Sequence, residues 1–317
     1  MVRQAALALL VLVLVGSGCR ESAPPGPPPA SPRIVSFSPA LTAMLFDLGL
    51  GDHVVGVTSQ DTLPAGQSRP VVGDAFSVNT EAVLAVKPDL VLTQVNPAAF
   101  DAVVRIQPSL RVEYVRIETL DDIRLAMQRL GRLAGNEQVG KAAAGEFQYK
   151  LDQVRRKVAG LDRPAVAFIT DFERLGSAGA GTFIDQLIDV AGGRNVAGRY
   201  TGWVTLTLES LIAEAPQVIV TQAPAAQHEQ VQAFWARHSQ LPAVQRKQFF
   251  AVSDPNWTIP TARMADLADA LADMIHPPSQ RATTQQAQTQ QAHTQQDQTQ
   301  QAQTAASATP AQGAPRE

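Results

Sequence analysis

Residues 80–94, TEAVLAVKPDLVLTQ, recur in altered form as residues 208–222, LESLIAEAPQVIVTQ. The two passages align without gaps and share the same residue type at five positions, while the apolar positions between them exchange one aliphatic residue for another. A second pair, LFDLGLGDHVVG from Leu45 and LIDVAGGRNVAG from Leu187, reads each time as a helix end followed by a glycine stop. The offsets of these pairs are 128 and 142. The chain therefore contains two copies of one α/β unit, and the first copy carries 14 extra residues within residues 57–79.

Short apolar strands alternate with amphipathic helices in both copies. The strands expected at residues 89–93 and 217–221 have continuously apolar centres, which is typical of parallel strands covered on both faces. Ser38 and Pro39 form a helix-start signal, and Glu81 is expected to open a helix capped by Thr80. The pattern predicts an α/β fold with two similar lobes, each a mainly parallel sheet flanked by helices. The expected strands cover residues 33–37, 54–57, 89–93, 112–115, 166–170, 217–221 and 249–252, and further helices residues 38–48, 100–107, 120–134, 182–190, 208–213, 229–238 and 261–275.

A long helix is predicted between the two copies. Residues 137–159 contain no proline, and their apolar positions recur in steps of four and three, so one stripe should be buried. At 1.5 Å per residue this helix would extend roughly 35 Å, longer than an ordinary crossover helix. We expect it to join the two lobes as a rigid backbone that limits their closure to a small hinge motion.

The ends of the chain have compositions unlike the centre. An apolar run behind Arg3 has the length of a secretory signal, and the small residues before Cys19, the single cysteine, resemble a bacterial lipobox. Lipidation of Cys19 would attach the protein to a membrane, and the proline-rich stretch after it would act as a tether. The expected divisions are a signal peptide (1–18), a tether (19–32), a first lobe (33–136), a connecting helix (137–160), a second lobe (161–277) and a disordered Gln/Thr/Ala-rich tail (278–317).

Several kinds of chemistry are disfavoured by the sequence. The net charge is −3, and no basic run occurs in the folded part, which argues against nucleic-acid binding. The histidines are scattered without metal-ligand spacing, so we expect neither a protein-bound metal nor a cofactor. No nucleophile elbow is present, and the glycine-rich run at residues 176–181 lacks the lysine of a phosphate-binding loop. We interpret that run as a flexible loop at the edge of a cleft, and the protein as a non-enzyme and a monomer.

Aromatic residues are few, so their positions are informative. Trp203 and Trp257 fall in expected loops at strand ends, where open α/β sheets bind ligands, whereas Trp235 falls inside a helix and should be packing. The candidate ligand-binding residues are Ser36, Ser38, Ser59, Gln60, Phe76, Phe172, Trp203, Trp257 and Arg263.

The sequence resembles a known family, the periplasmic binding proteins of cobalamin and iron-chelate ABC importers. The resemblance covers residues 33–275, and it is carried by RIVSFSPALTAMLFDLGLGDHVVGV from Arg33, NTEAVLAVKPDLVL from Asn79, GTFIDQLIDVAGGRNVA from Gly181 and LESLIAEAPQVIV from Leu208. It implies capture of a bulky metal chelate and its delivery to a permease dimer with a cytoplasmic ATPase. It also implies that one surface glutamate on each lobe docks to the permease, and the motifs place these at Glu81 and Glu209.

The resemblance leaves the chelate open. Trp203 stands six residues before Glu209, as a ligand-contacting tryptophan does in the cobalamin branch, so cobalamin or a related corrinoid is the first candidate. The first lobe departs from that branch, because Leu63 and Ala75 replace aromatic residues. The alternatives are an iron siderophore, for which Arg69, Arg199 and Arg263 are candidate contacts, and haem, for which Tyr114, Tyr149 and Tyr200 are candidate ligands. An alternative of another class is a structural lipoprotein that interacts through its tail.

Overall fold

The computed structural model describes residues 31–74 and 76–278. The expected signal peptide, Cys19 and the Gln-rich residues from 279 onward lie outside the described residues. The fold described here falls within a single compact unit that starts at Pro32.

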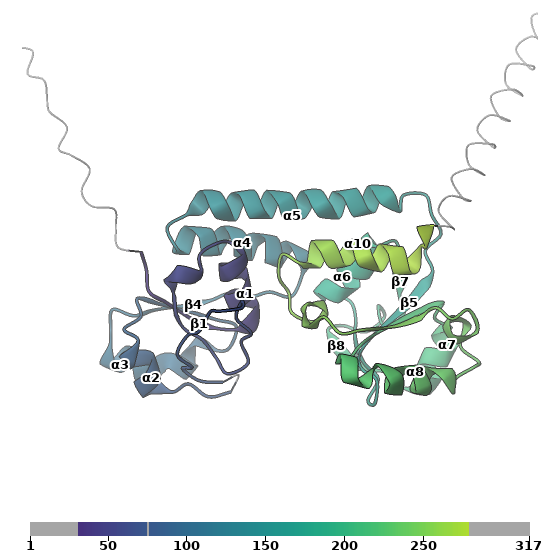
Figure 1. The fold of residues 1–317 in the computed structure, drawn as a ribbon, viewed down its shortest axis with the longest axis horizontal. Coiled ribbons are helices and arrows are strands. Elements are labelled where there is room, and N and C mark those ends of the chain that lie inside the picture. The colour runs from purple at the N-terminus through teal and green to yellow at the C-terminus, as the bar shows by residue number, and fades with distance from the viewer. Residues whose placement is uncertain (1–30, 75, 279–317) are drawn as a thin grey trace, which may run out of the picture. The chain divides into compact units, whose positions relative to one another are not determined.

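The first lobe is built on a four-stranded parallel sheet in the order β2-β1-β3-β4, of which Figure 1 labels β1 and β4. β1, β3 and β4 pair in continuous register, with Ile34 opposite Leu90 and Leu90 opposite Arg111, whereas the pairing of β1 with β2 is irregular between Ile34 and Val35. β1 and β3 are buried along their whole length, as their continuous apolar sequences predicted. The elements are β1 Ile34–Phe37, α1 Pro39–Asp47, η1 Gly51–His53, β2 Val54–Gly56, α2 Thr80–Ala85, β3 Leu90–Thr93, η2 Pro97–Phe100, α3 Asp101–Ile106 and β4 Arg111–Tyr114.

Helices cover both faces of this sheet. Val35 and Val91 pack with side chains of α2 and α3, whereas Ile34 and Leu92 pack on the opposite face with α1 and the long helices. Successive side chains of a strand point to opposite faces of the sheet. Because helices cover both faces, all the side chains of such a strand are buried and can be apolar.

The helix starts follow the sequence signals with one correction. Ser38 caps α1, because its Oγ accepts a hydrogen bond from the backbone N–H of Leu41, and Pro39 occupies the first helical position as predicted. Thr80, expected to cap α2, is instead the first residue of that helix. The cap is Asn79, whose side-chain oxygen accepts a 3.0 Å hydrogen bond from the N–H of Ala82. Asn and Thr both serve as caps, so sequence alone left the boundary uncertain by one residue.

The second lobe contains the corresponding parallel strands and an added antiparallel part. Its sheet has the order β10-β9-β5-β6-β8, and β7 pairs with the beginning of β5. Strands β10, β9, β5 and β7 run parallel to one another, while the added strand β6 pairs antiparallel with β5 on one side and with β8 on the other. The elements are β5 Ala165–Asp171, β6 Gly176–Ala178, α6 Phe183–Val190, β7 Arg194–Asn195, β8 Trp203–Thr205, α7 Leu208–Glu214, β9 Val218–Gln222, η3 Ala225–Gln227, α8 His228–Ala236, α9 Pro242–Gln245, β10 Phe249–Val252, η4 Pro255–Trp257 and α10 Met264–Ile275.

The two lobes share one strand arrangement. The order β2-β1-β3-β4 corresponds to β7-β5-β9-β10, and the repeated passage forms α2 with β3 in one lobe and α7 with β9 in the other. The duplication inferred from the sequence therefore agrees with the topology. The lobes differ at the loop of residues 57–79, as expected, and also at β6 and β8, which the sequence analysis did not anticipate.

The glycine-rich run is not a flexible loop over its first half. Gly176–Ala178 is strand β6, and the hydroxyl of Ser177 donates a 2.8 Å hydrogen bond to the carbonyl of Phe168. A Cβ atom on Gly179 would lie 2.3 Å from the carbonyl oxygen of Tyr200. Small residues are needed here because two backbone segments approach closely. In the sequence, such a run of small residues looks like a loop.

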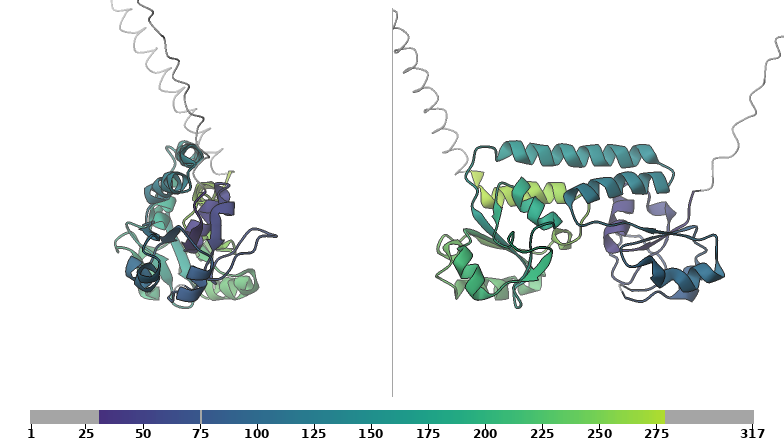
Figure 2. Two further views of the ribbon diagram at one scale, coloured as in Figure 1. Left: turned by 90° about the vertical axis from the view of Figure 1, so that its left-hand side faces the viewer. Right: turned by 180° about the vertical axis from the view of Figure 1, so that it is seen from behind.

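The chain passes from the first lobe to the second through α4 (Leu120–Leu133) and α5 (Glu137–Lys157), and α10 packs against α5. Figures 1 and 2 show α5 alongside α4 and α10. α5 is the long helix predicted over residues 137–159, and it ends two residues earlier, after 21 residues. Lys150 and Lys157 of α5 form ion pairs of 2.8 and 2.6 Å with Asp266 and Asp269 of α10. One apolar core contains side chains from both sheets and from all three helices.

Candidate functional site

A pocket of about 260 Å³ is walled by both lobes. Its first-lobe wall comes from α1 and from the loop after β2, and its second-lobe wall from the segment between β10 and α10. These segments follow the carboxyl ends of parallel strands, the position at which open α/β sheets bind ligands. The lining residues are Pro39, Ala43, Phe46, Asp47, Gln60, Thr62, Leu63, Pro64, Pro255, Asn256, Ile259 and Arg263.

A second pocket, of about 390 Å³, adjoins the first and shares Asp47 and Arg263 with it. It lies where α1, α5 and α10 meet, and four carboxylates and two cations line it. Its charged lining residues are Asp47, Glu146, Lys150, Asp254, Arg263 and Asp266.

Five of the predicted ligand residues are exposed. Gln60 and Arg263 line the pocket between the lobes. Phe76 is 99% exposed and Trp203 is 55% exposed, with the Trp203 ring packed edge-on against Phe183 at a centroid distance of 5.7 Å. Ser59 is also exposed, next to Gln60. Trp203 lies in strand β8 and not in the loop that the sequence suggested.

The other four predicted ligand residues are buried. The hydroxyl of Ser36 accepts a 2.8 Å hydrogen bond from Thr42, and Ser38 is used as the α1 cap. Phe172 and Trp257 pack against Phe234 and Phe168, with ring centroids 5.7 and 5.8 Å apart. These side chains are not accessible to a ligand in this structure.

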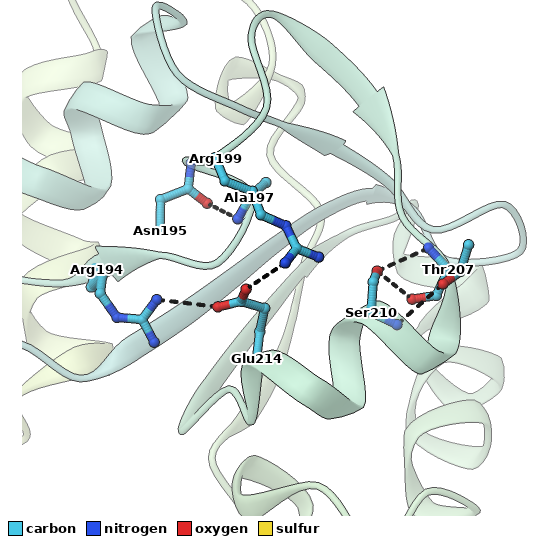
Figure 3. A network of polar contacts seen from close by, with 7 residues as sticks. All are labelled: Arg194, Asn195, Ala197, Arg199, Thr207, Ser210 and Glu214. Atoms are coloured by element: carbon cyan, nitrogen blue, oxygen red, sulfur yellow. Dashed lines mark hydrogen bonds and ion pairs between the residues drawn. The ribbon is translucent and has the colours of Figure 1, made fainter.

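Two of the three candidate arginines are engaged within their own lobe. The guanidinium of Arg69 donates to the carbonyl oxygens of Val54 and Gly51 at 2.6 and 3.1 Å and lies over the ring of Phe46. Figure 3 shows Arg199 paired with Glu214, a contact of 3.2 Å.

Arg199 also covers the ring of Tyr200 at 4.9 Å. Arg263 differs from Arg69 and Arg199, because it lines both pockets. The candidate haem ligands Tyr114, Tyr149 and Tyr200 do not contribute to the wall of the pocket between the lobes.

Asp47 was not selected from the sequence, and it lies opposite Arg263 across the lobes. Partial burial raises the pKa of the Asp47 carboxyl above its usual value, and the charge of Arg263 opposes that shift. Asp47 is the last residue of α1, where the negative end of the helix dipole disfavours a carboxylate. An acid placed against its own helix dipole is the one sequence signal that could have identified it.

The two predicted docking glutamates occupy equivalent places. Glu81 and Glu209 are each the second residue of a short helix, and both side chains are exposed. Thr207 caps α7 by accepting a 3.1 Å hydrogen bond from the N–H of Ser210, and Figure 3 shows this cap together with Glu214 at the other end of the helix. Glu214 is held by Arg194 and Arg199 at 3.3 and 3.2 Å, so α7 is fixed at both ends.

The described part of the chain has neither a metal-binding cluster nor a membrane-spanning helix. Over residues 31–74 and 76–278, no three His, Cys, Asp or Glu side chains are grouped so that they could hold a metal ion. Over the same residues, no helix combines the length and apolar character needed to cross a bilayer.

Comparison with known proteins gives matches over most of the described residues. A family model described as "Periplasmic binding protein" matches residues 34–255. The chain is 28% identical over 255 residues to an ABC transporter substrate-binding lipoprotein, YvrC, of Bacillus subtilis, covering 77% of this chain and 80% of that protein. It is 28% identical over 242 residues to the vitamin B12-binding protein of Vibrio cholerae, covering 75% and 86%.

Solved structures show the same fold. The vitamin B12-binding protein BtuF of Vibrio cholerae superposes with a TM-score of 0.67 at 24% identity, covering 77% of this chain and 96% of that one. A periplasmic haem-binding protein from Pseudomonas aeruginosa superposes with a TM-score of 0.66 at 22% identity, covering 78% and 94%. Proteins named for different ligands thus share this architecture, so the fold does not identify the ligand.

Proposed function

Because this chain belongs to the family of periplasmic binding proteins, we propose that it captures a bulky metal chelate between its lobes and delivers it to an ABC importer. Cobalamin or a related corrinoid is the first candidate, since several relatives matched at up to 28% identity are vitamin B12-binding proteins. The observation that carries the proposal is the pocket lined by loops of both lobes at the carboxyl ends of their sheets.

Two exposed aromatic rings suit a ligand with large flat faces. Phe76 lies five residues before Glu81, and Trp203 lies six residues before Glu209, so each lobe presents an exposed ring just ahead of its docking helix. A ring that is already held in place stacks on a ligand at little cost in conformational entropy, and the contact of Trp203 with Phe183 restrains it in this way.

The matched glutamates support docking to a two-subunit permease. Glu81 and Glu209 are exposed at equivalent positions on duplicated helices, and a permease dimer presents equivalent sites to the two lobes. Among the described residues neither carboxylate has an ion-pair partner. Both are therefore free to pair with cationic groups of a partner. Each carboxylate is held in place on a helix, Glu81 on α2 and Glu209 on α7.

An anchor at Cys19 completes the proposal. Lipidation of that thiol would hold the protein at the envelope membrane, and residues 19–32 would keep the lobes clear of the surface. The match to a lipoprotein of Bacillus subtilis supports this assignment. The protein would act as a monomer, with one lobe for each permease subunit.

Capture of haem or an iron siderophore is the second candidate, supported by the haem-binding proteins that share the fold. Calorimetry with cobalamin, cobinamide, haem and ferric siderophores distinguishes the candidates. We expect Trp203→Phe, at a ring that is 55% exposed, to weaken corrinoid affinity, while Tyr149→Phe, on exposed α5 surface, leaves that affinity unchanged. If none of these chelates binds, the proposal is contradicted.

A further inference from the structure

The pocket between the lobes has an unusual charge arrangement. Its lining includes one acid, Asp47 from the first lobe, and one base, Arg263 from the second, and their formal charges cancel. The adjoining pocket shares both residues and adds three carboxylates but one cation, so the region behind the cleft is acidic.

Both residues are placed against their own helix dipoles. Asp47 ends α1, where the dipole disfavours an acid, and Arg263 directly precedes α10, where the dipole disfavours a cation. Neither position stabilises its helix, and each charge is favoured by the opposite charge across the lobes. Among the described residues Arg263 has no direct ion pair, so its guanidinium stays available to a ligand.

The other arginines near the cleft are not available in this way. Arg69 is bonded to backbone carbonyls, and Arg199 is held by Glu214 and Tyr200. A cleft that selects an anionic chelate needs uncompensated cations, because burying a carboxylate or catecholate without a partner is costly. Arg263 is the one arginine in the lining of this pocket, and Asp47 offsets it.

We propose that Asp47 sets the ligand charge accepted by the cleft: by offsetting Arg263, it makes the site favour uncharged or cationic chelates over anionic ones. This inference rests on the proposed capture of a chelate in this pocket. Corrinoids with carboxamide side groups belong to the favoured class, whereas haem with free propionates and ferric catecholates belong to the disfavoured class.

A matched ligand pair isolates charge from shape. Cobinamide carries carboxamides around the corrin ring, and the fully hydrolysed corrin acid carries carboxylates at the same positions. Calorimetry at low ionic strength should show that the wild-type protein prefers cobinamide. In Asp47→Asn the affinity for the corrin acid should rise about threefold to tenfold, and the affinity for cobinamide should stay within about twofold.

Two further variants complete the test. Asp52→Asn removes the same charge from an exposed first-lobe position outside both pockets, so its ratio of affinities should match the wild type. Arg263→Gln removes the cation, so its affinity for the corrin acid should fall below that of the wild type. This change is opposite in direction to the one expected for Asp47→Asn. Raised salt should reduce both effects, because screening weakens interactions between exposed charges.

The outcomes separate this inference from the proposed function. Equal ratios for Asp47→Asn and Asp52→Asn, or a wild-type preference for the corrin acid, would overturn the charge assignment while leaving chelate capture intact. Binding of an uncharged ferric hydroxamate without any corrinoid would contradict the corrinoid proposal and support the charge assignment. A wild-type protein that binds no chelate of either charge would overturn both.

Discussion

The backbone N–H of Leu120 donates a 2.7 Å hydrogen bond to the side-chain oxygen of Gln186. Leu120 is the first residue of α4, which follows the first lobe, and Gln186 lies in α6 of the second lobe. The first N–H groups of a helix have no partner within the helix. A side chain of the second lobe thus accepts a hydrogen bond from a free N–H group at the start of α4, the helix that follows the first lobe.

Replacing Gln186 by alanine should lower the free energy of unfolding by about 1 to 2 kcal/mol, because the N–H of Leu120 would lose its partner. Urea unfolding followed by circular dichroism measures the change. Gln232→Ala is the control, since Gln232 is exposed on α8 and should change stability by less than about 0.5 kcal/mol. Equal effects of the two variants would show that water satisfies Leu120 equally well.

Gly140 should not tolerate a side chain, although it lies inside helix α5. A Cβ atom there would lie 2.5 Å from the carbonyl oxygen of Met127 on α4, so Gly140→Ala should destabilise the protein by about 1 to 3 kcal/mol through overpacking. Gly145→Ala, in the same helix with open space around its Cβ, should stabilise by about 0.5 to 1 kcal/mol. Thermal unfolding of the pair measures both, and stabilisation by both changes would contradict the close crossing of α4 and α5.

Reversing both docking charges should separate transport from binding. The double variant Glu81→Lys and Glu209→Lys should lose ligand-stimulated ATPase activity with the reconstituted importer, because each lobe would meet a cationic site with a like charge. Chelate affinity should be unchanged, since neither residue lines a pocket between the lobes.

The matched control for that experiment is Asp101→Lys with Glu229→Lys. These acids are also exposed in first helical turns, one in each lobe, but outside the repeated passage. The control should retain ATPase stimulation. Loss of stimulation in both double variants would indicate an effect of net charge and not of docking.

The stability contribution of Asp122 should disappear in acid. Burial tends to raise the pKa of this carboxyl, but hydrogen bonds from the N–H groups of Glu118 and Thr119, each 3.0 Å long, prevail and hold it below its usual value of 3.8. A carboxyl with a lowered folded-state pKa stabilises fully above its unfolded pKa and loses that contribution as the pH falls through the folded value. The stability difference between wild type and Asp122→Asn should therefore stay constant above about pH 5 and shrink below about pH 4. A difference that persists at pH 2 would contradict this.

The architecture was predictable because burial and duplication leave strong patterns. The continuous apolar runs ending at Thr93 and Thr221 became buried parallel strands, and the uninterrupted apolar stripe of residues 137–159 became α5. These features depend on local periodicity, which a single sequence displays directly.

The candidate site was less predictable because it depends on which loops meet. Ser36 and Trp257 follow the expected pattern of loop or strand-end ligands, yet tertiary packing encloses them. Asp47 and Ile259 line the pocket, and they are more than two hundred positions apart in sequence. Strand β6 was missed because it consists of glycine, serine and alanine, and the first two normally indicate loops.

The apolar core that spans α4, α5 and α10 changes how the duplication can be understood. Ile34 near the start of the described chain and Ile275 near its end belong to the same buried cluster. Each repeat has its own sheet, but the apolar side chains that pack on one face of the two sheets belong to a single cluster. Deleting either repeat would expose apolar surface of the remaining one to water. The two copies are thus obligate halves that should melt in one cooperative transition.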